Sequence, residues 1–208
     1  MKNIWLDIEL SDYEEHMALP DVAQSQYLSQ YLFNTIELYN PGGVAILGSS
    51  GGNGLEKIDR NKVKKISCVD INANFLEAAK NRYHNKFDDI EFICQDIASS
   101  GFTISNVDLV YAGLVFEYVD LIQAISNISK FLNKNGKLAV ILQQPNENIP
   151  EVTPSKYKSL EKLSELFRFV SPIEFSKLCE DYNIKLISQN ETELKSGKKF
   201  TELIFQKL

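Results

Sequence analysis

Small residues and acidic residues stand at positions where this chain could bind a ligand. The stretch VAILGSSGGNG places glycine at positions 48, 51, 52 and 54, directly after an apolar run. Backbone without Cβ atoms can approach a ligand closely, and its N–H groups can donate to a carboxylate or phosphate. Asp70 and Asp96 each follow a later apolar run, where a carboxylate can accept hydrogen bonds from hydroxyl or amino groups. The pattern predicts a site for a small polar ligand, although the glycines alone also fit a tight turn.

Repeated strand and helix patterns position these residues. Apolar runs rich in β-branched residues alternate with segments of helical periodicity, which is typical of βαβ units and a parallel sheet buried on both faces. The expected strands are 44–47, 66–69, 90–94, 107–111, 137–142, 184–190 and 200–205. The expected helices are 21–39, 73–83, 121–132 and 172–182, and a further helix-like pattern follows the glycines. The last two strands predict an antiparallel hairpin that closes a doubly wound, Rossmann-like α/β sheet.

The glycine turn lacks the dinucleotide fingerprint Gly-x-Gly-x-x-Gly. Counting from Gly48, the second and third glycine positions hold Ser50 and Asn53. A cofactor with a pyrophosphate is therefore disfavoured, because the second glycine admits that group and the third allows close packing of helix on strand. An NAD(P)-dependent oxidoreductase stays open as an alternative.

Composition narrows the classes of partner. The 208 residues carry a formal net charge of -6, which disfavours a nucleic-acid substrate. Two short lysine runs, 59–65 and 195–199, are predicted to be solvated turns. Three unpaired cysteines suggest neither disulfides nor a zinc site, and Cys68 and Cys94 are expected in the core. An acidic N-terminus and the lack of a long apolar run predict a cytoplasmic protein without a membrane segment.

The order of five motifs resembles the class I S-adenosylmethionine-dependent methyltransferases. The motifs VAILGSSGGNG, SCVDINANFLEAAKNRY, FICQDI, VDLVYAGLVFEYV and NKNGKLAVIL cover residues 44–144 in register. The family's sheet has a reversed seventh strand beside the sixth, in agreement with the expected hairpin. The resemblance implies S-adenosyl-L-methionine as cofactor and S-adenosyl-L-homocysteine as product.

The resemblance also assigns cofactor-binding residues. It implies that the turn through Gly48, Ser49, Ser50 and Gly52 faces the methionine part, with Asn53 opening the next helix. It implies that Asp70 binds both ribose hydroxyls, that Asp96 and the Ile97 N–H bind adenine, and that Ile71 covers the ring. Ala112 and Gly113 are the expected contacts to the methionine part after the fourth strand. Ordinary core packing for Ile71 and a helix N-cap for Asp70 are the competing interpretations.

Two positions depart from the family pattern. Ile46 stands where the family usually has an acidic residue, and Ser50 replaces its second glycine. The first departure removes a carboxylate that often organises the loop or meets the cofactor's amino group. The departure either lowers affinity or is offset by another group, such as Glu117 or a residue of the N-terminal segment.

The N-terminal segment SDYEEHMALPDVAQSQYL resembles the lid of small-molecule methyltransferases. Tyr13, His16 and Gln24 are predicted to line the substrate pocket, with His16 as a candidate general base because its unperturbed pKa lies near neutrality. A partly exposed histidine on a solvated helix is the alternative for His16. Tyr118 is a second catalytic candidate that either faces the pocket or caps the following helix. We therefore expect a lid over residues 1–40 and a methyltransferase domain over 41–208, with 145–170 as an insertion above the strand ends.

The predicted function is methyl transfer to an unidentified small molecule. The pattern for methylating exocyclic amines of bases and the Pro-Cys nucleophile are both absent. The alternatives are the oxidoreductase named above and a catalytically inactive cofactor-binding module. Neither the acceptor atom nor the oligomeric state follows from the sequence.

Overall fold

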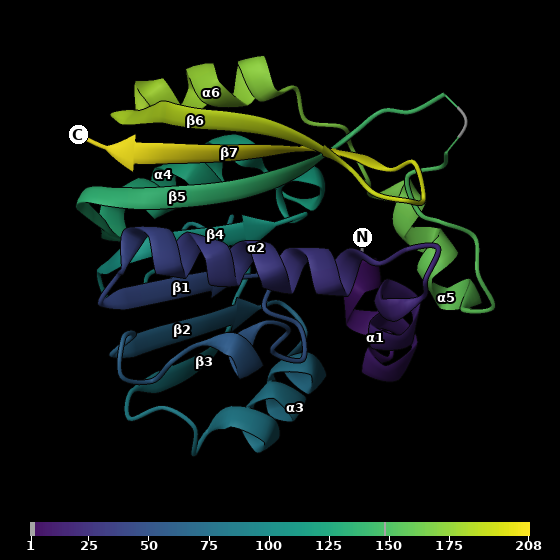
Figure 1. Cartoon of the computed structure of the whole chain (residues 1–208), viewed down its shortest axis with the longest axis horizontal. Helices are drawn as coiled ribbons and strands as arrows, with labels where there is room; N and C mark the ends of the chain where they lie inside the picture. Colours follow the sequence, from purple (N-terminus) through teal and green to yellow (C-terminus); the bar gives the residue numbers. More distant parts are fainter. Residues whose placement is uncertain (1–2, 148) are drawn as a thin grey trace.

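A seven-stranded sheet with helices on both faces forms the frame of the protein. The computed structural model describes residues 3–147 and 149–208. The strand order is β3-β2-β1-β4-β5-β7-β6, and only β7 runs antiparallel to its neighbours β5 and β6 (Figure 1). The strands are β1 (Gly43–Leu47), β2 (Lys65–Asp70), β3 (Ile90–Cys94), β4 (Val107–Gly113), β5 (Leu132–Gln144), β6 (Ile184–Glu193) and β7 (Lys199–Lys207). The predicted fold class and the reversed strand are confirmed.

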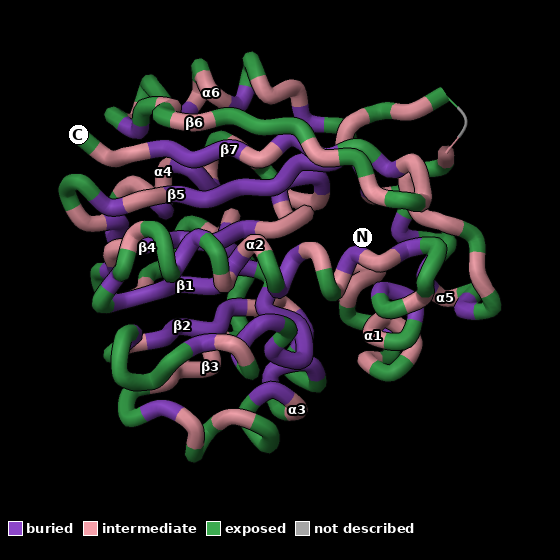
Figure 2. Tube along the Cα trace, in the orientation of Figure 1, coloured by how far each residue is buried: buried purple, intermediate pink, exposed green. Residues whose placement is uncertain are grey.

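Two pairs of helices bury the two faces of the sheet. The helices α2 (Gln24–Tyr39) and α3 (Ala73–Tyr83) pack on one face, and α4 (Leu121–Phe131) and α6 (Pro172–Asp181) pack on the other. Every residue of β1 is buried, and the central strands form the most deeply buried layer in Figure 2. A near-continuous apolar strand requires cover on both sides, which explains the layered arrangement.

Side-chain caps fix the predicted helix starts. Ser171 accepts from the Glu174 N–H and precedes Pro172, while Asp120 accepts from the Gln123 N–H. Asn72 caps α3 by accepting from the N–H groups of Asn74 and Phe75. The N-cap is therefore Asn72, which leaves the side chain of Asp70 outside the capping interaction.

Two structural expectations are wrong. The glycine turn leads only into the short 3-10 helix η2 (Leu55–Lys57), not into an α-helix, since positive φ angles at Gly52 and Gly54 interrupt helical geometry. The side chain of Cys94 is exposed, because it ends the edge strand β3 and has a sheet neighbour on one side only. Cys68, on β2, is buried as predicted.

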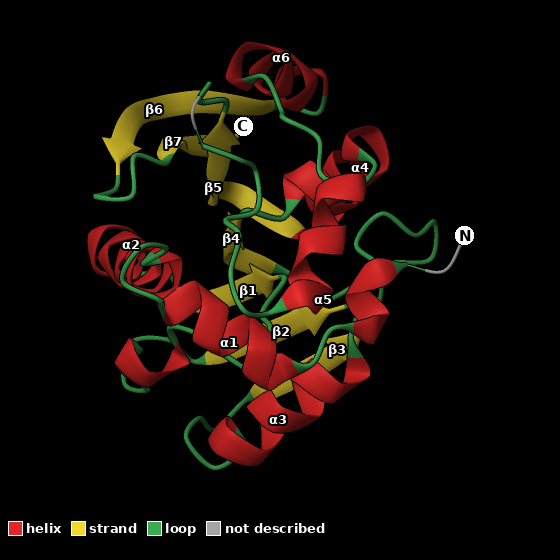
Figure 3. Ribbon diagram, turned by 90° about the vertical axis from the view of Figure 1, so that its right-hand side faces the viewer, coloured by secondary structure: helices red, strands yellow, loops and turns green. Residues whose placement is uncertain are grey.

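A third layer lies beyond the carboxyl ends of the parallel strands. It contains η1 (Ile4–Asp7), α1 (Leu10–Ala18), α5 (Lys158–Glu161) and the 3-10 helix η4 (Lys162–Glu165), and Figure 3 shows α1 and α5 in front of the strand ends. Ile8 packs there against Phe75 of α3 and against Tyr157, Leu160 and Leu163. Among the described residues, no helix has the length and apolar character needed to cross a bilayer.

Candidate active site

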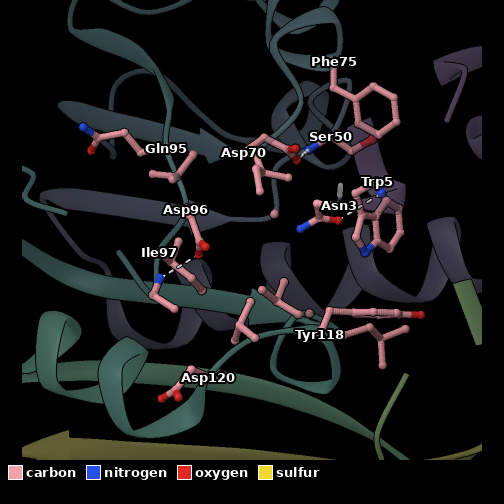
Figure 4. Close-up of a pocket in the computed structure, with 18 of the residues that line it drawn as sticks. Asn3, Trp5, Ser50, Asp70, Phe75, Gln95, Asp96, Ile97, Tyr118 and Asp120 are labelled. Carbon is pink, nitrogen blue, oxygen red and sulfur yellow. Dashed lines mark hydrogen bonds between the residues drawn. The ribbon is translucent and has the colours of Figure 1, made fainter. Parts of the chain in front are cut away.

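A cavity of about 330 Å³ opens at the carboxyl ends of β1, β2, β3 and β4. Figure 4 shows side chains from these strand ends on one side and Asn3, Trp5 and Phe75 on the other. Parallel sheets bind ligands outside their carboxyl ends, where strand order reverses, and here the order reverses between β1 and β4. Nine predicted residues line this cavity: Tyr13, Gly48, Ser50, Asp70, Ile71, Asp96, Ile97, Gly113 and Tyr118.

Asp70 lies at the end of β2 with both carboxylate oxygens held by backbone. Oδ2 accepts from the Ser50 N–H at 2.9 Å and Oδ1 accepts from the Asn72 N–H at 2.9 Å. Burial raises the pKa of Asp70, and the backbone N–H groups of Asn72, Ser50 and Ile71 oppose that rise. A carboxylate has further lone pairs, so Asp70 can hold the turn and still accept from a ligand hydroxyl.

The glycine turn brings backbone close to this carboxylate. Gly48 has φ +66°, and a Cβ there would lie 2.6 Å from Cγ2 of Val115. Ser50 has φ +50° although it carries a side chain, a conformation that is costly for L-residues. The hydrogen bond from its N–H to Asp70 stabilises that conformation. The departure from glycine at position 50 therefore leaves the turn intact.

Asp96 and Ile97 follow β3 on the far side of the cavity. Asp96 is exposed, and its Oδ1 accepts from the Ala98 N–H at 2.8 Å. Ile97 is buried, and its carbonyl accepts from Nδ2 of Asn127 on α4 at 2.9 Å. This bond between the loop and α4 holds the main chain at Ile97 beside the carboxylate of Asp96. Such an arrangement can bind a flat heterocycle that carries an amino group.

Aromatic side chains form the wall opposite the strand ends. The Trp5 ring meets Tyr13 and Tyr118 edge to face, with centroid distances of 5.7 Å and 5.1 Å. Tyr13 stacks on Phe75 at 5.9 Å. Tyr118 faces the cavity from η3 (Phe116–Tyr118) and does not cap α4, since Asp120 does. Burial raises the pKa of Tyr13 and of Tyr118, so both phenols stay neutral at physiological pH.

A second pocket of about 280 Å³ continues from the first along the glycine turn. The two pockets share Tyr13, Gly48, Ser50 and Gly113, while Ser49 and Asn53 line the second alone. Arg82 and Glu14 form a two-pronged ion pair at its wall, with Nη2 donating to Oε2 at 3.0 Å. Arg82 Nη1 also donates to the Gly51 carbonyl at 3.1 Å. Ile46, where the family pattern has an acidic residue, lines the same pocket as the carboxylate of Glu14.

A third, smaller chamber of about 50 Å³ lies behind the aromatic wall. His16 and Gln24 line it, together with Tyr13, Tyr118 and Lys198. His16 is 5% exposed, which contradicts the solvated-helix alternative, and its Nδ1 lies 3.0 Å from Ser155 Oγ. Burial and nearby Lys198 lower the pKa of His16, so its imidazole is neutral at physiological pH and can accept a proton.

Glu117 is buried beneath this chamber and is 1% exposed. Its Oε1 accepts from the Gln143 N–H at 2.8 Å, whereas its Oε2 has no hydrogen-bond partner among the described residues. Burial raises the pKa of Glu117 to about 7. Glu117 does not line either large pocket, so it is not positioned to replace the acidic residue missing at Ile46.

Some predicted positions lie outside the pockets, and other lining residues were not predicted. Ala112 and Gly52 do not line any of the three pockets described above. Lys198 belongs to the lysine run expected to be solvated, yet it is 3% exposed. The unpredicted lining residues include Asn3, Trp5, Glu14, Arg82 and Lys198. No local pattern marks them, since each reaches the site by tertiary packing.

Residues 46–140 match the sequence family described as "Methyltransferase domain". A search of curated protein sequences found no match. The fold is similar to that of the N-methyltransferase NodS from Bradyrhizobium japonicum, solved with S-adenosyl-L-homocysteine, with 15% identity, TM-score 0.67, and 88% of this chain and 87% of NodS covered. Magnesium protoporphyrin IX methyltransferase from Synechocystis, also solved with S-adenosyl-L-homocysteine, aligns with 14% identity, TM-score 0.64, and coverage of 90% and 84%.

The resemblance to class I S-adenosylmethionine-dependent methyltransferases is confirmed by the family match and the shared fold. Residues 46–140 match the model of a methyltransferase domain, and neither this match nor the shared fold supports the oxidoreductase alternative. The same fold occurs in the [4+2]-cyclase SpnF, with 11% identity, TM-score 0.65, and coverage of 85% and 80%. Fold alone therefore does not fix the reaction, and the site residues must carry that argument.

Proposed function

We propose that this protein is an S-adenosylmethionine-dependent methyltransferase that acts on a small-molecule acceptor. S-adenosylmethionine is the cofactor that the family match and the shared fold support. The observation that carries the proposal is one continuous cavity that brings Gly48, Ser50, Asp70, Asp96 and Gly113 together from four strand ends. These residues offer backbone donors at one end and two separated carboxylates for hydroxyl and amino groups at the other.

Each part of the cavity then has a role. Asp70 accepts from the ribose hydroxyls, and Asp96 with the Ile97 N–H meets the adenine, while Ile71 covers its ring. The pocket beside Gly48, Ser49 and Ser50 receives the methionine part. There Glu14 faces the ammonium group of the methionine part, and Arg82 faces its carboxylate. The Glu14–Arg82 ion pair then exchanges part of its own contact for contact with these two charges.

The remaining task of the chain is to position the acceptor and exclude water. When bound, the cofactor supplies an electrophilic methyl group on a sulfonium sulfur. Methyl transfer is an in-line displacement, so catalysis depends on alignment. We propose that residues 1–40 act as a lid, because Trp5, Tyr13 and α1 close the cavity from the side opposite the sheet. Tyr13, His16, Gln24 and Tyr118 then surround the acceptor, with neutral His16 able to take a proton from it.

Calorimetry tests the cofactor assignment. We expect the purified protein to bind S-adenosylmethionine and S-adenosylhomocysteine but not NAD(H) or NADP(H). Binding of a nicotinamide dinucleotide in place of both sulfur compounds would overturn the proposal.

Methyl-labelled cofactor offered with metabolite extracts tests catalysis. A labelled small-molecule product that disappears in Asp70→Ala is the expected result. Cofactor binding without labelled product from any extract would favour the inactive binding module instead.

A further inference from the structure

Lys198 is a buried cation in a chamber that the cofactor does not need. It stands in the turn between β6 and β7, next to exposed Lys199, and is 3% exposed. Its Nζ donates to the Glu151 carbonyl at 2.7 Å. An ammonium has three N–H donors, and no other acceptor for this one is found among the described residues.

The charge of Lys198 lacks a counter-ion within the described part of the chain. No carboxylate there lies within ion-pair distance of its Nζ; Glu151 acts on it electrostatically from farther away. Burial lowers the pKa of Lys198 to about 8, so the ammonium form still predominates at neutral pH. A buried ammonium without a counter-ion is costly, which makes an incoming anion favourable.

A second polar group in the chamber also lacks a partner. Gln24 is 5% exposed, and its Nε2 has no hydrogen-bond acceptor among the described residues. Gln24 and Lys198 come from helix α2 and the β6–β7 turn, and both line the same chamber as His16. Two side chains with N–H donors left over, both lining one chamber, fit a ligand that supplies acceptors only, as an anion does.

The chamber borders both larger pockets. It shares Trp5, Leu114 and Tyr118 with the first pocket, Met17 with the second, and Tyr13 with both. Its volume of about 50 Å³ equals room for roughly three to five water-sized groups. That space suits a carboxylate and the carbon next to it, with the rest of the molecule directed past Tyr13.

We propose that the methyl acceptor is a small carboxylic acid whose carboxylate pairs with Lys198 and accepts from Gln24. This inference rests on the proposed function, because it names the substrate class of the same site. Lys198 then acts as a substrate-binding residue that fixes one end of the acceptor while His16 faces its reactive region. The contact to the Glu151 carbonyl positions the ammonium and links the turn to the loop after β5.

Matched acids and amides provide the test. The probes are acetate, benzoate and phenylacetate, each paired with its neutral amide, and inorganic phosphate as a second anion. Protein saturated with S-adenosylhomocysteine is titrated with each probe, and binding is followed by calorimetry and thermal shift. We expect at least one carboxylate to bind, with its amide about ten- to a hundredfold weaker. Stronger binding of phosphate than of every carboxylate would overturn the choice of carboxylate.

Variants assign the preference to Lys198. Lys198→Gln should remove the preference for acid over amide, whereas Lys199→Gln, which changes an exposed lysine paired with Glu193 at 3.8 Å, should keep it. Affinity for S-adenosylhomocysteine and the far-ultraviolet spectrum confirm that each variant is folded. If Lys198→Gln does not fold, the comparison of acids with amides in the unmodified protein still decides the charge question.

The outcomes separate this inference from the proposed function. Failure to bind S-adenosylhomocysteine contradicts the methyltransferase assignment. Binding of S-adenosylhomocysteine with equal affinity for acids and amides, or with no carboxylate bound, contradicts only the role of Lys198. A preference for acids that survives in Lys198→Gln does the same.

Discussion

Asp70, Asp96 and the turn at Gly48 stand at the ends of neighbouring strands, and main-chain N–H groups hold both carboxylates. His16 and Lys198, in contrast, come from α1 and from the β6–β7 turn, at opposite ends of the chain, and meet only in the third chamber. The proposed cofactor side is thus positioned by the sheet itself. The acceptor side is positioned by packing of the segments that cover it. A fold of this kind can therefore keep its cofactor site and change its acceptor when the covering segments change. Binding residues are commonly placed in this way, on loops over a rigid scaffold.

Replacing His16 should produce the largest effect. Because a positioned general base contributes about a hundredfold or more, His16→Ala should lower turnover by that amount and leave affinity for S-adenosylhomocysteine nearly unchanged. Turnover is measured with methyl-labelled cofactor, and affinity by calorimetry. Ser155→Ala keeps the imidazole ring and removes its contact at Nδ1, together with the bond from the Tyr157 N–H, so it should have the smaller effect. Unchanged turnover in His16→Ala would exclude His16 from the mechanism.

Glu117 lies beneath the acceptor side and should make stability depend on pH. Its pKa rises from 4.5 to about 7 on folding, so the folded protein keeps a proton that the unfolded chain releases. The contribution of Glu117 to the free energy of unfolding is complete below the pKa of the unfolded chain. It is lost as pH rises through about 7, and the loss is on the order of 3 kcal/mol.

Glu117→Gln should abolish that loss, because the amide stays neutral and its oxygen can still accept from the Gln143 N–H. Urea unfolding at about pH 5 and about pH 8 measures the difference. Equal slopes of stability against pH in both proteins would contradict the buried ionisation.

Asp70 tests the cofactor side. Hydrogen bonds to a charged group contribute about 1.5–3 kcal/mol each, so Asp70→Ala should weaken S-adenosylhomocysteine binding by about ten- to a hundredfold. Asp70→Asn can still accept from the Ser50 N–H, so it separates the turn from the charge. Similar affinities in all three proteins would show that Asp70 does not contact the ribose.

The ion pair at the edge of the cofactor side should give the smallest effect. Both partners are partly exposed, so Glu14→Gln should weaken S-adenosylhomocysteine binding by about tenfold or less, and the difference should shrink as salt is added. Glu15→Gln is the matched control, since Glu15 faces Tyr157 and Lys156 and not the pocket. The same loss in both variants would contradict a specific role for Glu14.

Local patterns predicted the parts of the site that depend on neighbours in the sequence. The turn at Gly48 and the carboxylates after β2 and β3 follow from an apolar run that ends in small or acidic residues. The helix expected after the glycines was wrong because Gly52 and Gly54 adopt positive φ, which interrupts helical geometry. The start of α2 at Gln24, three residues later than expected, has the same kind of cause, since Ala23 has φ +51°.

Long-range packing decided the rest. Arg82 meets Glu14 across 68 positions of sequence, and Lys198 reaches the Glu151 carbonyl across 47. Lys198 stood in a charged run typical of a solvated turn, and its burial brings it beside residues of the N-terminal segment and of the loop after β5. Residue type and spacing describe a residue's immediate neighbours, and they carry no information on which distant segment will cover it.

The amino-acid sequence by itself determined the α/β sheet, its reversed strand and the strand-end residues that line the first cavity, because alternating periodicity and local turns act over short stretches of chain. Only the tertiary structure decided which side chains close the acceptor side. The N-terminal segment, the loop after β5 and the β6–β7 turn come together there through burial of apolar surface, and that force is not directional and depends on the whole fold.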